Sequence, residues 1–159
     1  MRSEDCLPIE DARIDDVPEI VALQKLAFQK EAERTGDWQM PAQTQTIDDL
    51  ASEFPNLRLF VIRDGGRIIA TGRAKLDGKT VRMGRLAVAP DWQGRGLGTR
   101  LLCALEASFP DSDRLEIFTS DVSLDNIRLY ERLGYHEFAR KKVKTLATLV
   151  YMEKRRNAS

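Results

Sequence analysis

The N-terminal part of the chain carries apolar residues at helical spacing. A start signal of two acids and a proline at residues 15–18 opens this pattern, which ends in the charged segment 31–36. Its apolar positions are Ile20, Leu23 and Ala27. Residues 38–45 contain Pro41 and predict a loop, in which Trp38 is expected to pack into the interior; the alternative is that it caps a binding site. A second short helix is predicted after Thr46, with the apolar stripe Ile47, Leu50 and Phe54.

From residue 57 onward the apolar spacing changes from helical to alternating. Asp-Gly pairs at residues 64–65 and 77–78 supply the turns of an antiparallel meander. In chain order, the predicted elements are strands at 59–62, 67–76 and 80–89, a helix at 98–109, a strand at 115–118, a helix at 125–133 capped by Gly134, and strands at 135–144 and 148–153. This order predicts an α/β fold with a mixed sheet and helices packed against it.

Composition and charge narrow the classes of function. The chain has 159 residues, so a single domain over residues 1–159 is expected. Lys plus Arg and Asp plus Glu are both 25, and this zero balance predicts neither a nucleic acid nor a membrane surface as partner. Cys6 and Cys103 lack metal-ligand spacing and indicate a reduced, cytoplasmic protein, with Cys103 packed in its helix. Because His136 is the only histidine, neither a His-based metal site nor a Ser-His-Asp triad is expected.

A glycine-rich segment lies between the third predicted strand and the helix that follows. Gly94, Gly96 and Gly98 alternate within the sequence QGRGLGT of residues 93–99. Glycines let the backbone approach a ligand closely, and the amides at a helix start bind anions, so the segment predicts a pyrophosphate site. Arg95 and Arg100 are placed to add positive charge. The alternative is that these glycines mark only a turn.

Two familiar nucleotide-binding motifs do not fit this segment. A Walker P-loop requires Gly-Lys-Ser/Thr, whereas Gly98 is followed by Thr99 and Arg100. A dinucleotide fingerprint requires a wider glycine spacing inside a parallel βαβ unit, whereas the preceding strands are predicted to be antiparallel. Neither motif is therefore expected here.

Residues 93–98 (QGRGLG) resemble the Gln/Arg-x-x-Gly-x-Gly/Ala signature of the GNAT superfamily of N-acetyltransferases. Residues 86–90 (LAVAP) are similar to the family's fourth strand, and residues 126–135 (NIRLYERLGY) to its Ala-Ile-x-Leu-Tyr-x-x-Leu-Gly-Phe motif. The predicted order of elements matches the family from about residue 9 to residue 153. The resemblance implies a GNAT-like α/β fold, with a mixed, mostly antiparallel sheet of six to seven strands and flanking helices.

The resemblance also implies roles for individual residues. Acetyl-CoA would be the co-substrate, without a metal; the fourth strand would hold its pantetheine arm and the glycine segment its pyrophosphate. The implied cofactor-binding residues are Leu86, Ala87, Val88, Gln93, Gly94, Arg95, Gly96, Leu97, Gly98, Thr99 and Asn126. Tyr130 matches the tyrosine that protonates the departing thiolate in many members, a task that suits a phenol protonated at neutral pH. The alternative for Tyr130 is a core aromatic beside Ile127 and Leu133.

Two positions depart from the family pattern. Many members carry Asn seven residues before the tyrosine, where this chain has Ser123, and Asn126 stands at the usual Ala position. The fourth strand of many members carries a glutamate as general base, whereas residues 82–85 (RMGR) contain no acid. The base must come from elsewhere, be water, or be unneeded for an amine that arrives neutral.

Candidates for the acceptor site lie in two regions. The carboxylates of the region that walls the acceptor pocket in this family are Glu31, Glu33 and Asp37. An ordinary surface pair with Arg34 is the alternative for Glu31. Arg73 and Arg85 are placed either to recognise a carboxylate of the acceptor or to cover a solvated sheet face.

The sequence thus predicts an enzyme that transfers the acetyl group of acetyl-CoA to a primary amine of a small molecule or peptide. No nucleic acid or membrane partner is expected, and a homodimer stays open. One rival is a non-catalytic acyl-CoA-binding or regulatory module of the same fold, which the missing acid in residues 82–85 favours. Another is an interaction subunit whose partner uses the sheet face.

Overall fold

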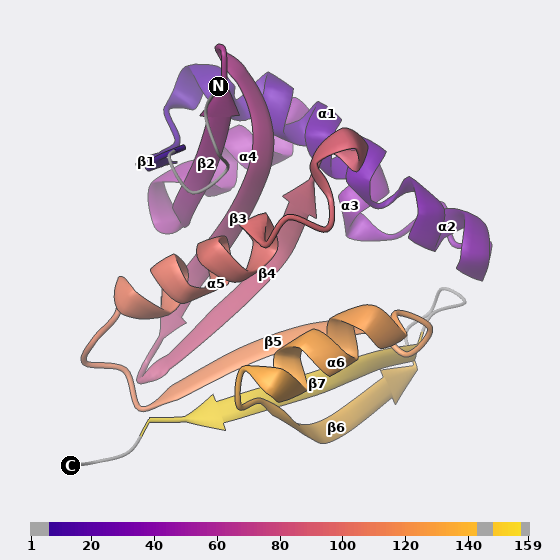
Figure 1. Cartoon of the computed structure of the whole chain (residues 1–159), viewed down its shortest axis with the longest axis vertical. Coiled ribbons are helices and arrows are strands. Elements are labelled where there is room, and N and C mark those ends of the chain that lie inside the picture. Colours follow the sequence, from indigo (N-terminus) through magenta and orange to yellow (C-terminus); the bar gives the residue numbers. More distant parts are fainter. Residues whose placement is uncertain (1–6, 143–147, 157–159) are drawn as a thin grey trace.

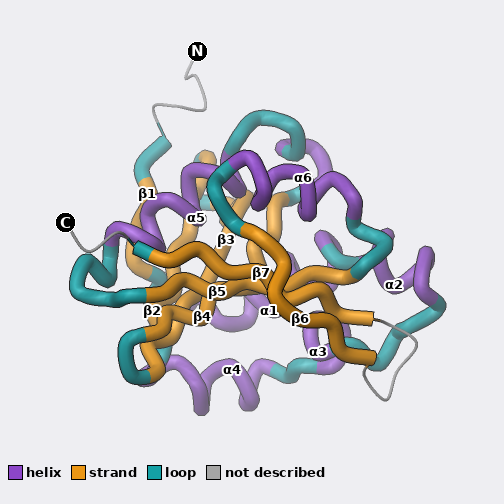
Figure 2. Tube along the Cα trace, turned by 90° about the horizontal axis from the view of Figure 1, so that it is seen from below, coloured by secondary structure: helices purple, strands orange, loops and turns teal. Residues whose placement is uncertain are grey.

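The computed structural model describes residues 7–142 and 148–156, which form a sheet with helices on both faces (Figure 1 and Figure 2). The strands are β1 (Ile9–Asp11), β2 (Arg58–Asp64), β3 (Arg67–Asp77), β4 (Thr80–Val88), β5 (Arg114–Ser120), β6 (His136–Lys142) and β7 (Thr148–Arg155). The helices are α1 (Val17–Ala27), α2 (Gln29–Thr35), α3 (Pro41–Thr44), α4 (Ile47–Glu53), α5 (Leu97–Ala107) and α6 (Leu124–Arg132). Short 3-10 turns are η2 (Ile14–Asp16), η3 (Phe54–Asn56) and η4 (Pro90–Trp92). Within the described ranges, no helix is long and apolar enough to cross a membrane.

The strands form one seven-stranded sheet in the order β1-β2-β3-β4-β5-β7-β6. Every neighbouring pair is antiparallel except β4 and β5, which run parallel and are connected through α5. The predicted fold class, a mixed and mostly antiparallel sheet with flanking helices, is confirmed. The first two hairpins turn at the predicted Asp-Gly pairs, where Gly65 and Gly78 adopt φ of 58° and 64°.

Helices cover the two faces of the sheet unequally. Figure 2 shows α5 and α6 on one face and α4 on the other. The helix α1 packs against β3 and β4 as well as against α3 and α4. On α5, the predicted stripe of Leu101, Leu102 and Leu105 is fully buried. Under this stripe, position 72 of β3 favours glycine, because a Cβ there would lie 2.6 Å from Cδ2 of Leu86.

Strands β4 and β5 remain paired only over their first residues. Their parallel register runs from Thr80 opposite Arg114 to Met83 opposite Ile117, whereas the pairing of β4 with β3 continues to Val88. Figure 1 shows the two strands diverging toward their carboxyl ends. The edge of β4 that faces β5 is therefore unpaired from residue 84 to residue 88, the last part of the strand before the connection that contains the glycine segment.

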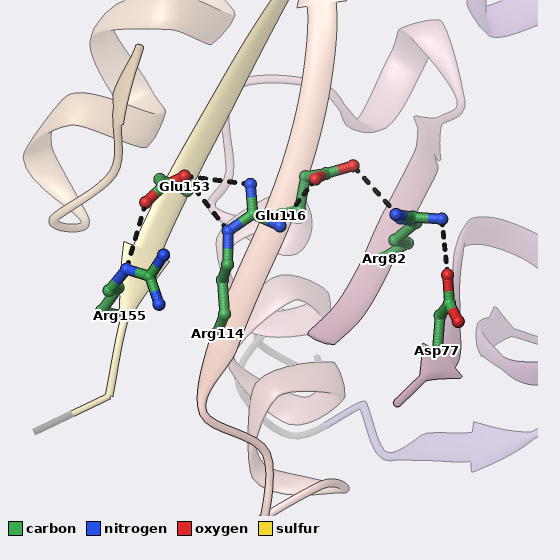
Figure 3. Close-up of polar contacts among 6 residues, drawn as sticks. All are labelled: Asp77, Arg82, Arg114, Glu116, Glu153 and Arg155. Carbon is green, nitrogen blue, oxygen red and sulfur yellow. Dashed lines mark hydrogen bonds and ion pairs between the residues drawn. The ribbon is translucent and has the colours of Figure 1, made fainter. Parts of the chain in front are cut away.

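Ion pairs connect β4, β5 and β7 where β4 and β5 are still paired (Figure 3). Arg82 on β4 contacts Glu116 on β5 at 3.3 Å. Arg114, also on β5, contacts Glu116 at 2.8 Å and Glu153 on β7 at 2.9 Å. The side chains of Arg114, Glu116 and Glu153 are only 13–15% exposed, so water screens these pairs weakly. The network ties β4, β5 and β7 together below the point where β4 and β5 part.

The N-terminal segments differ most from the sequence-based prediction. The predicted first helix is divided at Phe28 into α1 and α2, and residues 41–44 of the predicted loop form the short helix α3. The strand β1 was not predicted; it adds to the sheet only through its pairing with β2. The second helix begins after Thr46 as predicted, and the Thr46 hydroxyl accepts from the Asp49 amide.

Three expected core positions lie at the surface. Trp38 is 48% exposed and Ile47 is 47% exposed, while Cys103 is exposed on α5. Ile47 and Cys103 lie on the outward faces of the helices α4 and α5, whose other faces pack against the protein. Trp38 lies in the surface loop between α2 and α3. Cys6 and the end of the predicted strand 135–144 lie outside the described residues.

Candidate active site

The connection from β4 to α5 contains three glycines. Two of them have a left-handed backbone conformation, and the third does not. Gly94 and Gly96 adopt φ of 78° and 80°, a left-handed conformation that glycine enters at little cost. Gly96 is the N-cap of α5. Gly98, in the first turn of α5, is not left-handed, and a Cβ placed there would meet nothing within 4 Å. The first two glycines allow the turn, whereas Gly98 keeps the space at the helix start open.

The first turn of α5 presents backbone amides outward. The Arg100 amide bonds back to the Gly96 carbonyl at 3.1 Å, so the amides of Leu97, Gly98 and Thr99 precede the first intrahelical bond of α5. The positive end of the helix dipole lies at the same place. This arrangement can bind an anion such as a pyrophosphate, at the position that the sequence predicts.

Polar side chains organise this connection. Nε2 of Gln93 donates to the Val88 carbonyl at 3.0 Å and so ties the loop to the end of β4. The Arg95 guanidinium stacks 4.6 Å over the Trp92 ring. Nη2 of Arg100 donates to the Leu7 carbonyl at 2.8 Å. Arg95 is exposed beside the loop, whereas Arg100 is turned toward the segment that precedes β1.

A β-bulge interrupts β4 just before the residues expected to hold the cofactor. The register with β3 passes from Gly84 opposite Arg73 to Ala87 opposite Thr71, so Arg85 and Leu86 together face one residue of β3. Arg85 has φ of 48°, the one positive value for a non-glycine residue among those described.

At the bulge, the side chains of Arg85 and Leu86 lie on opposite faces of the sheet. Leu86 lies with Leu101 and Leu105 of α5 around the bare Cα of Gly72. Nη1 of Arg85 donates to Oε1 of Gln45, which follows α3, and to Oε1 of Gln24 on α1 at 3.4 Å.

Arg85 and Arg73 are held inside the layer of N-terminal helices. The Arg73 side chain is 16% exposed and contacts Glu53 on α4 at 3.6 Å. Burial lowers the pKa of Arg85 to about 10; the nearby charge of Arg73 acts in the same direction and Glu53 opposes it. Burial likewise lowers the pKa of Arg73, against the opposing charge of Glu53. The interpretation that these arginines cover a solvated sheet face is therefore wrong.

A hollow of about 340 Å³ adjoins Arg85. Its lining residues are Pro41, Thr44, Gln45, Asp49, Ser52, Glu53 and Arg85. A second hollow, of about 420 Å³, lies on strands β4 to β7, where Phe118, Phe138 and Tyr151 line it together with Arg82, Met83, Glu116, Ala139 and Lys141. Phe118 and Phe138 are about half exposed, so this second hollow is a partly apolar surface of the sheet.

Tyr130 and Glu31 come together from distant parts of the chain. Tyr130, on α6, is 5% exposed, and its ring lies 6.2 Å from that of Tyr135. Burial raises the pKa of Tyr130, and the negative charge of Glu31 raises it further, so the phenol keeps its proton at neutral pH. Oε1 of Glu31 accepts a hydrogen bond from Oγ of Ser123 at 2.5 Å, which links α2 to the start of α6. Ser123, rather than Arg34, is thus the partner of Glu31 in this structure.

The other candidate polar residues have local partners. Glu33 is exposed and accepts from Gln29. Asp37 is 4% exposed; its Oδ1 accepts from the Gln39 amide, and its Oδ2 has no hydrogen-bond partner among the described residues. Nδ2 of Asn126 lies 3.4 Å from Oγ1 of Thr119. In the described part of the chain, no group of three or more His, Cys, Asp and Glu residues could hold a metal ion.

Sequence reasoning missed the residues that surround the two arginines. Gln24 and Gln45 are both buried, and Glu53 closes the same cluster from α4. Periodicity gave no signal for them, because glutamine on a surface helix is ordinary. The available signal was the pair of arginines at 73 and 85, in strands otherwise rich in apolar residues.

Known proteins share both the sequence pattern and the fold. Residues 18–135 match the model of the acetyltransferase (GNAT) family. The UPF0157 protein YqkA of Bacillus subtilis is 26% identical over 119 residues, which are 75% of this chain and 34% of YqkA. The chain thus spans about a third of the length of that curated relative.

Solved structures of low sequence identity have the same fold. The PaiA N-acetyltransferase of Thermoplasma acidophilum, solved in complex with coenzyme A, superposes with a TM-score of 0.76 at 13% identity, over 94% of this chain and 99% of that one. YncA of Salmonella typhimurium, solved with acetyl-CoA, superposes with a TM-score of 0.73 at 21% identity, over 96% of each chain. At such identities the likeness shows the fold of this chain.

Proposed function

Because the chain belongs to the GNAT acetyltransferase family, we propose that it is an enzyme that transfers the acetyl group of acetyl-CoA to a primary amine. The acceptor is a small molecule or a peptide. The catalytic unit is a single domain over residues 1–159, and its expected place is the cytoplasm, where unpaired cysteines stay reduced.

One observation carries the proposal: β4 parts from β5 after Met83, so that residues 84–88, which lead into the glycine connection and the start of α5, have no strand partner on that edge among the described residues. The freed edge of β4 offers backbone groups that a strand-like pantetheine arm can pair with. The amides of residues 97–99 and the open space at Gly98 suit the pyrophosphate at the other end of that arm. By the family resemblance, we assign Leu86, Ala87 and Val88 to the first task and residues 93–99 to the second.

The residues on hand support direct transfer. The amine nitrogen attacks the thioester carbon, a C–N bond forms and the C–S bond breaks, while an amide of β4, that of Val88 or a neighbour, polarises the carbonyl. Tyr130 gives its phenolic proton to the departing thiolate. Burial beside Glu31 suits this role, since it keeps the proton on the phenol until negative charge develops on sulfur.

We assign Glu31 as the general base that accepts the proton of the amine. No acid lies in residues 82–85, Glu33 is exposed and paired with Gln29, and Glu31 is close enough to Tyr130 for its charge to affect the phenol. Glu31 takes the proton that the amine nitrogen releases. Passing that proton to the Tyr130 phenolate returns both side chains to their starting states.

Release of free thiol tests the proposal. The full chain is incubated with acetyl-CoA and a panel of primary amines, and a thiol reagent measures coenzyme A; acetyl-CoA binding is measured in parallel by thermal shift. Thiol release that requires an amine supports acetyl transfer. Binding without release from any amine would favour the non-catalytic acyl-CoA-binding module, for which the acid-free residues 82–85 are the best argument. Absence of binding would favour an interaction subunit.

A further inference from the structure

Two partly buried arginines on the sheet are incompletely neutralised. Arg73 on β3 and Arg85 on the bulge of β4 are near enough for one charge to affect the other, and Glu53 is the carboxylate that acts on both. The Glu53 side chain is 43% exposed and stands 3.6 Å from Arg73. One half-exposed carboxylate cannot balance two largely buried guanidinium groups, and burying an unbalanced charge is costly. A bound anion would offset part of this unbalanced charge.

Hydrogen-bond donors in the same cluster lack acceptors. Nη1 of Arg73 and Nε2 of Gln24 are buried and have no partner among residues 7–142 and 148–156. Gln24 is held beside Arg85, because its Oε1 accepts from Nη1 of that arginine. Buried polar groups in folded proteins almost always have partners. Both atoms are enclosed and neither residue lines the hollow, so they mark a polar cluster that the protein leaves unbalanced, and the group that a ligand can reach is the Arg85 guanidinium.

The cluster lies where an acceptor has to approach. The helix α5 covers one face of β4, where Leu86 meets Leu101 and Leu105, so the second substrate must reach the freed edge of β4 from the opposite face. Arg85 points to that opposite face, toward α1 and the end of α3. It belongs to the unpaired stretch of β4, three residues before Val88, and it lines the hollow of about 340 Å³.

We propose that the amine acceptor carries a carboxylate and that Arg85, supported by Arg73, binds this carboxylate on the face of β4 opposite α5. The inference rests on the proposed acetyl transfer and names the substrate class of that site. A planar guanidinium matches the two oxygens of a carboxylate, and the positive charge of a second guanidinium behind it adds attraction. Amino acids and similar amines with a nearby carboxylate fit the Arg85 guanidinium. The second ammonium group of a diamine would be repelled by Arg85, although the carboxylates of Asp49 and Glu53 line the same hollow, so a diamine belongs in the test.

Matched acids and amides provide the first test. Free L-amino acids and their C-terminal amides differ only in the carboxylate, so thiol release from acetyl-CoA is compared within each pair, with 1,4-diaminobutane as a further amine. We expect kcat/KM for the best acid to exceed that of its amide by about 10- to 100-fold, the usual worth of a charged hydrogen bond. Amides or the diamine reacting as well as the acids would overturn the carboxylate assignment while leaving acetyl transfer intact. No reaction with any amine would overturn acetyl transfer itself.

Substitution of Arg85 provides the second test. Arg85→Gln should lower kcat/KM for the best acid by about 10- to 100-fold, leave its amide nearly unchanged and leave the acetyl-CoA Kd unchanged. Arg85→Lys keeps the charge without the fork and should fall between the parent chain and Arg85→Gln. Arg82→Gln is the matched control: it lies on the same strand, its side chain is 57% exposed, and it should leave the preference for acids unchanged.

The two tests are read together. An equal loss for acids and amides in Arg85→Gln would assign Arg85 to folding rather than to carboxylate binding, and would overturn the proposal. If Arg85→Gln does not fold, the acid and amide pairs on the parent chain and the graded effect of Arg85→Lys still decide it.

Discussion

Gly98→Ala should make the fold more stable and remove acetyl-CoA binding at the same time. Gly98 lies in the first turn of α5 without a left-handed φ, and an added Cβ would meet no atom within 4 Å. The methyl group therefore causes no clash or backbone strain in the protein itself. Alanine in place of helical glycine contributes up to about 0.5–1 kcal/mol, mainly by restricting the unfolded chain. For a chain of this size, that corresponds to a rise in Tm of about 1–4 °C.

Binding should respond in the opposite direction. A phosphate that accepts from the first-turn amides of α5 must come within about 3 Å of the backbone, in the space that the new methyl group would occupy. Losing close contact with these amides removes charge-assisted hydrogen bonds worth about 1.5–3 kcal/mol each. We therefore expect the acetyl-CoA Kd to rise by at least about 100-fold, which equals about 2.8 kcal/mol.

Calorimetry measures both quantities on the same preparation. Scanning calorimetry gives Tm without ligand, and titration with acetyl-CoA gives Kd. Cys103→Ala is the control, because it raises helix propensity at an exposed position of the same helix and should leave Kd unchanged. Gly96→Val is also expected to abolish binding, but a β-branched residue at φ of 80° would strain the loop as well. A Gly98→Ala chain that is folded and binds acetyl-CoA with nearly the parent Kd would refute the assignment of this loop.

Three further outcomes follow from named contacts. Tyr130→Phe should lower kcat by roughly 10- to 1000-fold with little change in acetyl-CoA Kd. Full turnover in the thiol-release assay would show that Tyr130 is a core aromatic and not the acid. Gly72→Ala should cost about 1–3 kcal/mol in urea unfolding, because the new Cβ would lie 2.6 Å from Cδ2 of Leu86; an unchanged midpoint would contradict the close packing of Leu86 against Gly72. Burial alone would raise the pKa of Asp16, but hydrogen bonds from the Arg63 side chain and the Arg13 amide outweigh it and lower the pKa. Asp16→Asn should then cost about 1–3 kcal/mol at neutral pH, and its deficit should shrink as pH falls below about 4, since the carboxyl's contribution is lost on protonation; a deficit independent of pH would exclude this ion pair as its source.

Much of the fold was readable from local pattern. The alternation in residues 57–89, together with Asp-Gly at both turns, predicted the meander of β2, β3 and β4, because two-residue turns and a two-residue side-chain period are local properties. The glycine segment before α5 and the cap at Gly134, which adopts φ of 98°, were also local. Local pattern failed between Phe28 and Thr46, where short helices depend on the surfaces they cover rather than on a long periodic stripe.

What the sequence by itself determined is the series of elements from β2 to β7 and the glycine connection that suits an anion. Only the tertiary structure decided which side chains come together at the candidate active site. Ser123 and Glu31 are 92 positions apart, and their hydrogen bond exists because α2 packs near the start of α6. Arg85 is buried rather than solvated because a bulge in β4 sets its side chain against Gln24 and Gln45. Burial and long-range contacts arise from the packing of whole elements, and no local spacing encodes them.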